Sequence, residues 1–236
     1  MATGPVEPRT PDEELIEAES PAVATTQDDA QRIHRVVAEL RTGFEALAGL
    51  GPAVSVFGSA RTPPASPGYE LAREVGRQFG RAGFAVITGG GPGAMEAANR
   101  GAREVGEGSV GINIELPWEQ RLNPYVDVSL RCHYFFTRKV FFVRYASGFV
   151  VVPGGFGTMD ELFEALTLIQ TGKAVNFAVV LLGSDYWGGL LEWMRARMLG
   201  EGKIAAADLD LVNVRDRPED AVAILTAAVA GQELPS

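Results

Sequence analysis

The stretch that decides the fold reads GFVVV at residues 148–152 and PGGFGTMDE at residues 153–161. The first five residues are apolar and rich in valine, which is typical of a buried strand. Residues 162–169 have apolar side chains at helical spacing and predict a helix after the glycines. Backbone N–H groups at the start of a helix, together with its dipole, suit a phosphate group. The stretch therefore predicts a strand, a phosphate-binding turn and a helix that carries Glu161.

The same alternation of strand and helix recurs on both sides of this stretch. Further strands are predicted at residues 53–57, 84–87, 110–114, 126–130 and 177–182, with a short one near 209–214. Further helices are predicted at about residues 68–82, from the 89–93 turn to about 105, and at 134–146, 186–199 and 218–230. Strands that alternate with helices imply a parallel sheet covered on both faces. We therefore expect an α/β protein with a Rossmann-like, doubly wound parallel sheet in a single domain.

The N-terminal part of the chain differs from the rest in composition. Residues 1–28 contain four prolines and several acids without a sustained period, and they predict a disordered acidic tail. Residues 29–49 have apolar side chains at helical spacing, and they predict an amphipathic helix. We expect this helix to cover the sheet edge or to join a subunit interface. The Rossmann-like domain, with this helix at its N-terminus, would then span residues 29–236.

Composition excludes several classes of function. The formal charge of −9 argues against broad nucleic-acid binding, which requires a positive field. The single cysteine, Cys132, cannot form an internal disulfide, and we find no secretory signal or long apolar span. We therefore expect a cytoplasmic protein without a membrane partner. His34 and His133 lack metal-ligand spacing with Cys132 or with acids, so no metal and no cofactor are predicted.

Three glycine-containing loops follow predicted strands, at Gly58-Ser59, residues 89–93 and residues 154–158. In a doubly wound sheet, ligands bind beyond the carboxyl ends of the strands, near a topological switch point. Glycine lets the backbone approach a ligand closely, although each loop alone could equally serve helix–strand packing. Residues 89–93 lack the spacing of a dinucleotide fingerprint, and no Gly-Lys-Ser/Thr follows them. Three such loops at one sheet edge indicate a ligand pocket.

The pattern PGGxGTxxE at residues 153–161 resembles the signature of the Lonely guy family, the cytokinin-activating phosphoribohydrolases. Arg138-Lys139 matches the Arg-Lys pair of that family, and residues 88–97 are similar to its first glycine-rich turn. The resemblance covers roughly residues 53–200. It implies hydrolysis of the N-glycosidic bond of an adenine-type nucleoside 5′-monophosphate, either AMP or an N6-substituted cytokinin riboside monophosphate. The products would be the free base and ribose 5-phosphate.

The chain departs from the plant-like pattern of the family, because Phe136-Thr137 stands where those members have His-Glu. With its long N-terminal extension, it resembles the longer bacterial branch. The resemblance implies a homo-oligomer, either a dimer or a hexamer of dimers.

The resemblance also implies residue roles. Glu161 would be the catalytic carboxylate, which stabilises a ribosyl cation and activates water. Arg138 would be its catalytic partner, gripping phosphate or orienting the ribose and the base. Thr158 would also suit a plain helix N-cap. The residues expected to bind substrate are Gly58, Ser59, Gly90, Gly91, Glu119, Lys139, Gly154, Gly155, Phe156, Gly157, Thr158, Met159, Asp160 and Thr167.

Rival functions remain to be weighed. Family members are often labelled possible lysine decarboxylases, but such enzymes need a Schiff-base lysine and an acid facing the cofactor ring. Lys139, Lys173 and Lys203 are the only lysines. Neither Lys173 nor Lys203 has a plausible acid partner in the sequence, and Lys139 is next to the positive Arg138. A second alternative is a non-catalytic protein that binds or senses nucleotides on the same fold. It would have no need for Glu161.

Overall fold

The computed structural model describes residues 7, 9–17, 28–116, 121–175 and 177–232 of the 236-residue chain. Its centre is a seven-stranded sheet in the order β4-β3-β2-β1-β5-β6-β7, in which every pair is parallel. The strands are β1 Ala53–Phe57, β2 Ala85–Thr88, β3 Ser109–Ile114, β4 Val128–Cys132, β5 Gly148–Val151, β6 Ala178–Leu182 and β7 Val212–Arg215. The strand order reverses between β1 and β5, which makes this the topological switch point.

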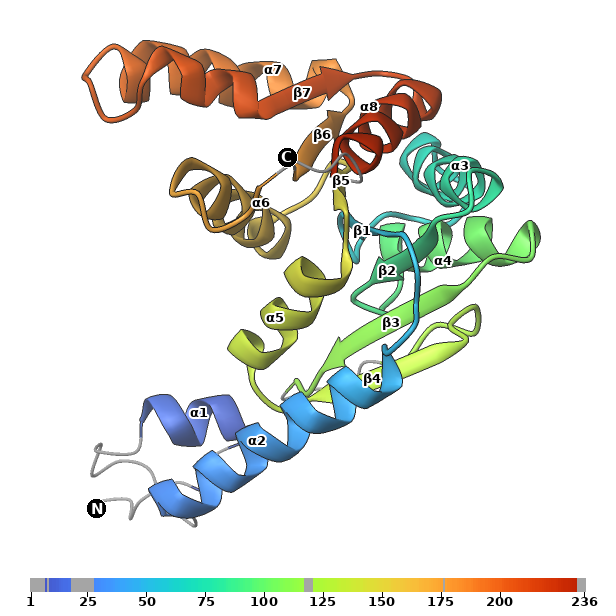
Figure 1. Ribbon diagram of the computed structural model, residues 1–236, viewed down its shortest axis with the longest axis vertical. Helices are drawn as coiled ribbons and strands as arrows, with labels where there is room; N and C mark the ends of the chain where they lie inside the picture. The colour runs from blue at the N-terminus through green and yellow to red at the C-terminus, as the bar shows by residue number, and fades with distance from the viewer. Residues whose placement is uncertain (1–6, 8, 18–27, 117–120, 176, 233–236) are drawn as a thin grey trace, which may run out of the picture.

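The helices are α1 Pro11–Ile16, α2 Asp29–Ala46, α3 Pro67–Arg81, α4 Ala94–Glu104, α5 Phe135–Tyr145, α6 Phe156–Gln170, α7 Ser184–Trp193 and α8 Pro218–Gln232. Side chains of α3, α4 and α8 pack on one face of the sheet, and side chains of α5, α6 and α7 pack on the other (Figure 1). The predicted doubly wound α/β fold is confirmed. None of the described helices is both long and apolar enough to cross a membrane.

Strands β5 and β6 are apolar throughout because both faces of the sheet are covered there. In β5, Phe149 and Val151 pack into the cluster beneath α5 and α6, whereas Val150 packs into the cluster beneath α3 and α8. All three side chains are buried. This explains why the sequence shows a run of apolar residues instead of a strict alternation.

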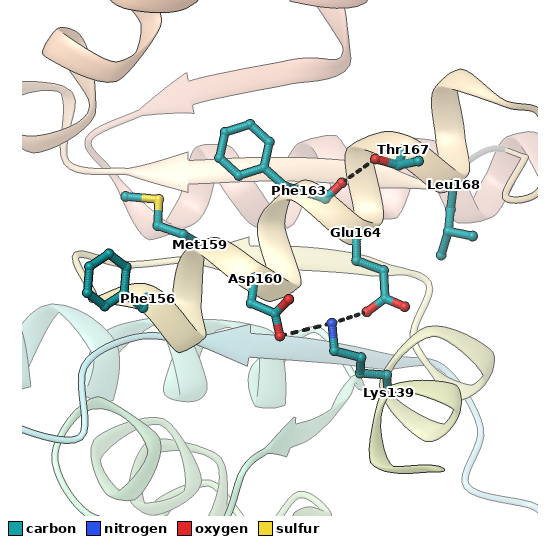
Figure 2. Close-up of a pocket in the computed structure, with 8 residues that line it drawn as sticks. All are labelled: Lys139, Phe156, Met159, Asp160, Phe163, Glu164, Thr167 and Leu168. Carbon is teal, nitrogen blue, oxygen red and sulfur yellow. Dashed lines mark hydrogen bonds and ion pairs between the residues drawn. The ribbon is translucent and has the colours of Figure 1, made fainter. Parts of the chain in front are cut away.

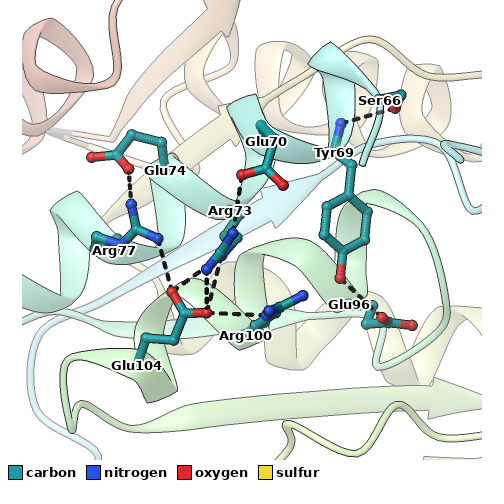
Figure 3. Close-up of polar contacts among 9 residues, drawn as sticks. All are labelled: Ser66, Tyr69, Glu70, Arg73, Glu74, Arg77, Glu96, Arg100 and Glu104. Atoms are coloured by element: carbon teal, nitrogen blue, oxygen red, sulfur yellow. Dashed lines mark hydrogen bonds and ion pairs between the residues drawn. The ribbon is translucent and has the colours of Figure 1, made fainter. Parts of the chain in front are cut away.

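Helices α3 and α4 pack together closely, and an ion-pair network connects them (Figure 3). A Cβ at Gly76 would overlap the carbonyl of Ala98, so only glycine fits there. At the C-terminal end of α4, Glu104 accepts hydrogen bonds from Arg73, Arg77 and Arg100 at 2.7–3.1 Å. These guanidinium groups, Arg73 first, lower the pKa of Glu104 to about 2. The network therefore joins the two helices by charge-assisted hydrogen bonds.

The structure corrects one prediction at the N-terminus. Residues 11–16, expected to lack regular structure, form α1, and the Thr10 side chain caps it by accepting a hydrogen bond from the Glu13 backbone. Thr10-Pro11-Asp12-Glu13 has the residues that favour a helix start, a signal that the prediction passed over. Buried Arg32 of α2 pairs with buried Glu14 of α1 and so ties the two helices together. The rest of the predicted tail lies outside the described residues, apart from residues 7, 9, 10, 17 and 28.

Several element boundaries also differ from the prediction. Helix α2 ends at Ala46, three residues earlier than expected. Helix α7 continues as a π-helical turn, Met194–Leu199. A 3-10 helix, Ala206–Leu211, occupies the first half of the expected last strand, so that β7 begins only at Val212.

Candidate active site

The three glycine-containing loops meet at the switch point between β1 and β5. The Ser59 N–H donates to the Pro153 carbonyl at 3.2 Å, and the Ala94 N–H donates to the Ser59 carbonyl at 3.0 Å. Gly93 has a φ of +70°, and a Cβ there would lie 2.5 Å from the Ser59 carbonyl oxygen. The loops after β1, β2 and β5 are therefore in direct contact.

Helix α6 begins at this meeting point, with Gly155 as an N-cap that makes no side-chain capping bond. Thr158 is the third helical residue and not the N-cap, so the capping interpretation of Thr158 is wrong. Its buried side chain lies against Gly154, where any Cβ would overlap the hydroxyl oxygen. The Tyr186 hydroxyl donates to the Gly154 carbonyl at 2.7 Å and orients this peptide. The start of α6 thus presents backbone N–H groups and the Thr158 hydroxyl, the chemistry that holds a phosphate.

Glu161 lies in the second turn of α6 on its inward face, and only 6% of the residue is exposed. Its Oε2 atom is buried and has no hydrogen-bond partner among the described residues. Burial raises the pKa of Glu161 to about 7, against the opposing effect of Lys139 and Arg138. A carboxyl group with a pKa near neutrality can exchange protons during a reaction, which is typical of a catalytic acid or base.

Arg138 extends from α5 towards the same region. Its guanidinium lies 5.0 Å from the centre of the Phe142 ring and against Gly89, where a Cβ would overlap Nη2. Its Nε atom is buried and has no hydrogen-bond partner among the described residues. Burial lowers the pKa of Arg138, while the charge of Glu161 raises it. Arg138 and Glu161 are therefore electrostatically coupled, and each keeps a polar atom that a ligand could satisfy.

The opposite, outward face of α6 forms a pocket of about 570 Å³ with Lys139 of α5 (Figure 2). The Lys139 ammonium pairs with Asp160 at 2.9 Å and with Glu164 at 2.8 Å. Phe156 is 96% exposed, and the Thr167 hydroxyl donates to the Phe163 carbonyl within its own helix at 2.7 Å. This pocket also contains Met159. The α6 residues of this pocket therefore lie on the face away from Glu161 and Thr158, although the sequence grouped them at one site. The Lys139 ammonium is nevertheless close enough to lower the pKa of Glu161.

The expected substrate-binding residues thus fall into two groups. One group belongs to the loops after β1, β2 and β5 and to the start of α6, and its members are Gly58, Ser59, Gly90, Gly91, Gly154, Gly155, Gly157 and Thr158. The others line the outward pocket, and these are Lys139, Phe156, Met159, Asp160 and Thr167. Glu119 lies outside the described residues.

A buried polar network that the sequence analysis missed holds the loop after β2. The Thr88 hydroxyl accepts from the Gly90 N–H at 2.9 Å, and the Gly90 carbonyl accepts from the Asn123 N–H at 2.8 Å. The Asn123 side chain donates to the Gly91 carbonyl at 3.1 Å and to Asn99 at 3.0 Å. Asn99 stands within an alanine-rich buried stripe of α4, and a polar residue in such a stripe is a sequence signal for a buried network.

Fold and site together define a Rossmann-like protein in which three glycine-containing loops meet at the switch point, near a buried arginine and a buried glutamate. The family model described as possible lysine decarboxylase matches residues 95–225. The cytokinin riboside 5′-monophosphate phosphoribohydrolase of Mycobacterium tuberculosis is 30% identical over 168 residues, which cover 69% of this chain and 88% of the relative. The chain therefore belongs to this family, the Lonely guy family.

Two further similarities extend this picture. A pyrimidine/purine nucleotide 5′-monophosphate nucleosidase of Escherichia coli is 34% identical over 153 residues, covering 56% of this chain and 32% of the relative. The solved structure of a molybdenum cofactor carrier protein from Chlamydomonas reinhardtii is 24% identical, with a TM-score of 0.59, over 76% of this chain and 98% of that one. The carrier supports the fold alone.

The lysines do not fit the pyridoxal chemistry that the family description suggests. Lys139 is held between two carboxylates, and Lys173 and Lys203 are exposed. A Schiff-base lysine instead needs a site that holds the cofactor ring and phosphate around it. Burial also raises the pKa of the Cys132 thiol to about 12, so it stays protonated and is a poor nucleophile.

Proposed function

We propose that this protein hydrolyses the N-glycosidic bond of adenine-type nucleoside 5′-monophosphates, releasing the free base and ribose 5-phosphate. The substrate would be AMP or an N6-substituted cytokinin riboside monophosphate. The observation that carries the proposal is the buried Glu161 carboxyl, whose pKa is raised to about 7, beside Arg138 at the meeting point of three glycine-containing loops. The names of the mycobacterial and Escherichia coli relatives support the same class of reaction.

In this mechanism, the 5′-phosphate binds the N–H groups at the start of α6 and the Thr158 hydroxyl. The bond between C1′ and the base nitrogen breaks, its electron pair leaves with the base, and the base takes up a proton from the solvent. The ribosyl group gains positive charge, which the ionised Glu161 stabilises. Glu161 then accepts a proton from the water whose oxygen bonds to C1′. The guanidinium of Arg138 orients the ribose and the departing base.

The rival function is a protein that binds the nucleotide without cleaving it. Such a protein needs the phosphate-binding loop, but a carboxyl group close to an anionic ligand opposes binding when it is ionised. Glu161 is buried, and its Oε2 atom has no hydrogen-bond partner among the described residues, an arrangement that lowers the stability of the fold. This cost favours catalysis over sensing.

We also propose that the chain forms a homo-oligomer, a dimer or a hexamer of dimers. In support, α5 and α6 expose large apolar side chains beside the outward pocket. Phe156 is 96% exposed, Phe136 46% and Val140 40%. Light scattering coupled to size exclusion would measure the molar mass, and Phe156→Glu should reduce it. A monomeric wild type would contradict this proposal.

Chromatography of reactions with AMP and with isopentenyladenosine monophosphate would test the activity. The wild type should release free base, Glu161→Gln should lose that release, and Glu192→Gln should keep it because Glu192 lies exposed on α7. Tight nucleotide binding without release of base would instead establish the sensing function.

A further inference from the structure

Helix α5 carries Arg138, yet nothing within α5 caps its start. The N-cap residue, Tyr134, makes no side-chain capping bond, and the first turn contains no acid. The first N–H groups of any helix need partners from elsewhere, and the positive end of its dipole favours carboxylates. Arg138 is the fourth residue of α5, so the order of this first turn decides where its side chain begins.

Two acids from the N-terminal helices supply what α5 lacks. The Phe135 N–H donates to the Asp12 carboxylate of α1 at 3.3 Å. The His133 N–H, immediately before the N-cap, donates to Glu39 Oε1 of α2 at 2.9 Å. The His133 ring nitrogen Nδ1 also contacts Glu39 Oε1. The start of α5 is thus capped by residues about a hundred positions away in the chain.

Glu39 makes the firmer of these contacts. Its Oε2 accepts from the Thr137 hydroxyl at 2.6 Å, and that hydroxyl also lies 2.8 Å from the Tyr134 carbonyl. The Glu39 side chain is only 7% exposed, and Thr137 is fully buried. One carboxylate therefore holds both His133 and Thr137 and so spans the N-cap of α5. Thr137 is the residue directly before Arg138.

The position of Arg138 tolerates little movement. Its guanidinium lies against Gly89, and a Cβ at that position would overlap it. The guanidinium also packs over the Phe142 ring, 5.0 Å from the ring centre. A shift or unwinding of the first turn of α5 would pull the guanidinium out of this fit. The phosphate loop is on α6, a separate element, and would stay in place.

On the basis of the proposed function, we propose that Glu39 is a positioning residue for Arg138: its carboxylate braces the first turn of α5 through Thr137 and the His133 amide. Helix α2 is then part of the support of the active site, in addition to contacting the edge strand β4. The transition state requires Arg138 in place, whereas phosphate binding depends on α6. Loss of the brace should therefore lower kcat and leave KM nearly unchanged.

The variants Glu39→Ala and Glu39→Gln test this inference, with Glu45→Gln as the matched control at an exposed position of the same helix. Since a misplacement of about 1 Å can cost about a hundredfold in rate, Glu39→Ala should lower kcat by about ten- to a hundredfold, with KM within about twofold. Glu39→Gln retains one acceptor and should recover part of the loss. Glu45→Gln should match the wild type. Equal kcat in all four proteins, or a rise in KM without loss of kcat, would overturn the proposal.

A second variant keeps the test decisive if Glu39→Ala folds poorly. Thr137→Val preserves the buried β-branched shape and removes only the hydroxyl. If Glu39 acts through Thr137, the Glu39→Gln and Thr137→Val losses in kcat should not add in the double variant. Losses that multiply independently would show that Glu39 acts by another route.

Hydrogen–deuterium exchange separates this inference from the proposed function. If the wild type hydrolyses no nucleotide, the proposed function fails. The effect of Glu39 on the order of the first turn of α5 can still be measured. Glu39→Gln should then speed amide exchange in residues 133–139 relative to the wild type, and Glu45→Gln should not. Unchanged exchange in this segment would overturn the brace, whatever the activity.

Discussion

Replacing Glu161 by glutamine should stabilise the protein while it abolishes activity. The carboxyl is 6% exposed, and burial is the main reason that its pKa rises from 4.5 to about 7. The folded protein therefore resists ionisation of this group, although Arg138 and Lys139 offset part of the cost. Glutamine keeps the shape and carries no charge, so the folded state no longer bears that cost.

The size of the effect follows from the pKa values of 4.5 unfolded and about 7 folded. Each pKa unit corresponds to about 1.4 kcal/mol, so at about pH 8 the ionised Glu161 destabilises the fold by about 3 kcal/mol. At about pH 5 the folded group is protonated, and the cost falls to about 1 kcal/mol. Because the folded pKa is raised, the fold is more stable at low pH, where Glu161 is protonated. This stability is lost as the pH rises from 4.5 through about 7.

Thermal unfolding at two pH values measures this difference. At about 2–4 °C per kcal/mol, Glu161→Gln should raise Tm by about 6–12 °C at about pH 8 and by only about 2–4 °C at about pH 5. Glu192→Gln, on the surface of α7, should leave Tm unchanged at both. A Glu161→Gln variant that is less stable than the wild type at about pH 8 would refute the reasoning. It would mean that the attraction between ionised Glu161 and buried Arg138 stabilises the fold by more than the burial of the Glu161 charge destabilises it.

Three further predictions concern rate and stability. The value of kcat/KM should rise with pH as Glu161 loses its proton, with an inflection at about pH 7 in a pH–rate profile. Gly89→Ala should lower kcat by about a hundredfold, because its Cβ displaces the Arg138 guanidinium, while Tm stays close to that of the wild type. Glu104→Gln should lower Tm at neutral pH by about 2–8 °C, since a partly exposed network of this kind contributes about 1–2 kcal/mol.

Specific results would contradict the predictions for the rate. A pH–rate profile without an inflection near pH 7 would show that ionisation of Glu161 does not control the reaction rate. Gly188→Ala, at an open position on α7, should not change kcat, and an equally small effect of Gly89→Ala would show that Arg138 is not held there. The Tm difference for Glu104→Gln should disappear as the pH falls from 4.5 towards 2, because the depressed pKa of Glu104 stabilises the fold only when it is ionised.

Some of the structure was predictable because it depends on neighbouring residues. The apolar run 148–152 and the glycines after it predict a strand, a turn and a helix without reference to the rest of the chain, and β5 and α6 confirm them. The start of α1 was equally local, at Thr10-Pro11-Asp12-Glu13, but the surrounding prolines and acids masked it. By contrast, the π-helical turn after α7 had no local signal that the analysis recognised.

The sequence by itself determined the alternation of strands and helices and the three glycine-containing loops, because hydrophobic period and turn chemistry act over a few residues. The resemblance to the Lonely guy family, and not periodicity, singled out Glu161 and Arg138. Tertiary structure alone decided which side chains share a site. Phe156 and Thr167 face the outward pocket while Glu161 faces inward, because α6 packs on the sheet along one side only. The raised pKa of Glu161 likewise depends on burial beneath distant segments, since removal from water is a property of the folded molecule and not of the local chain.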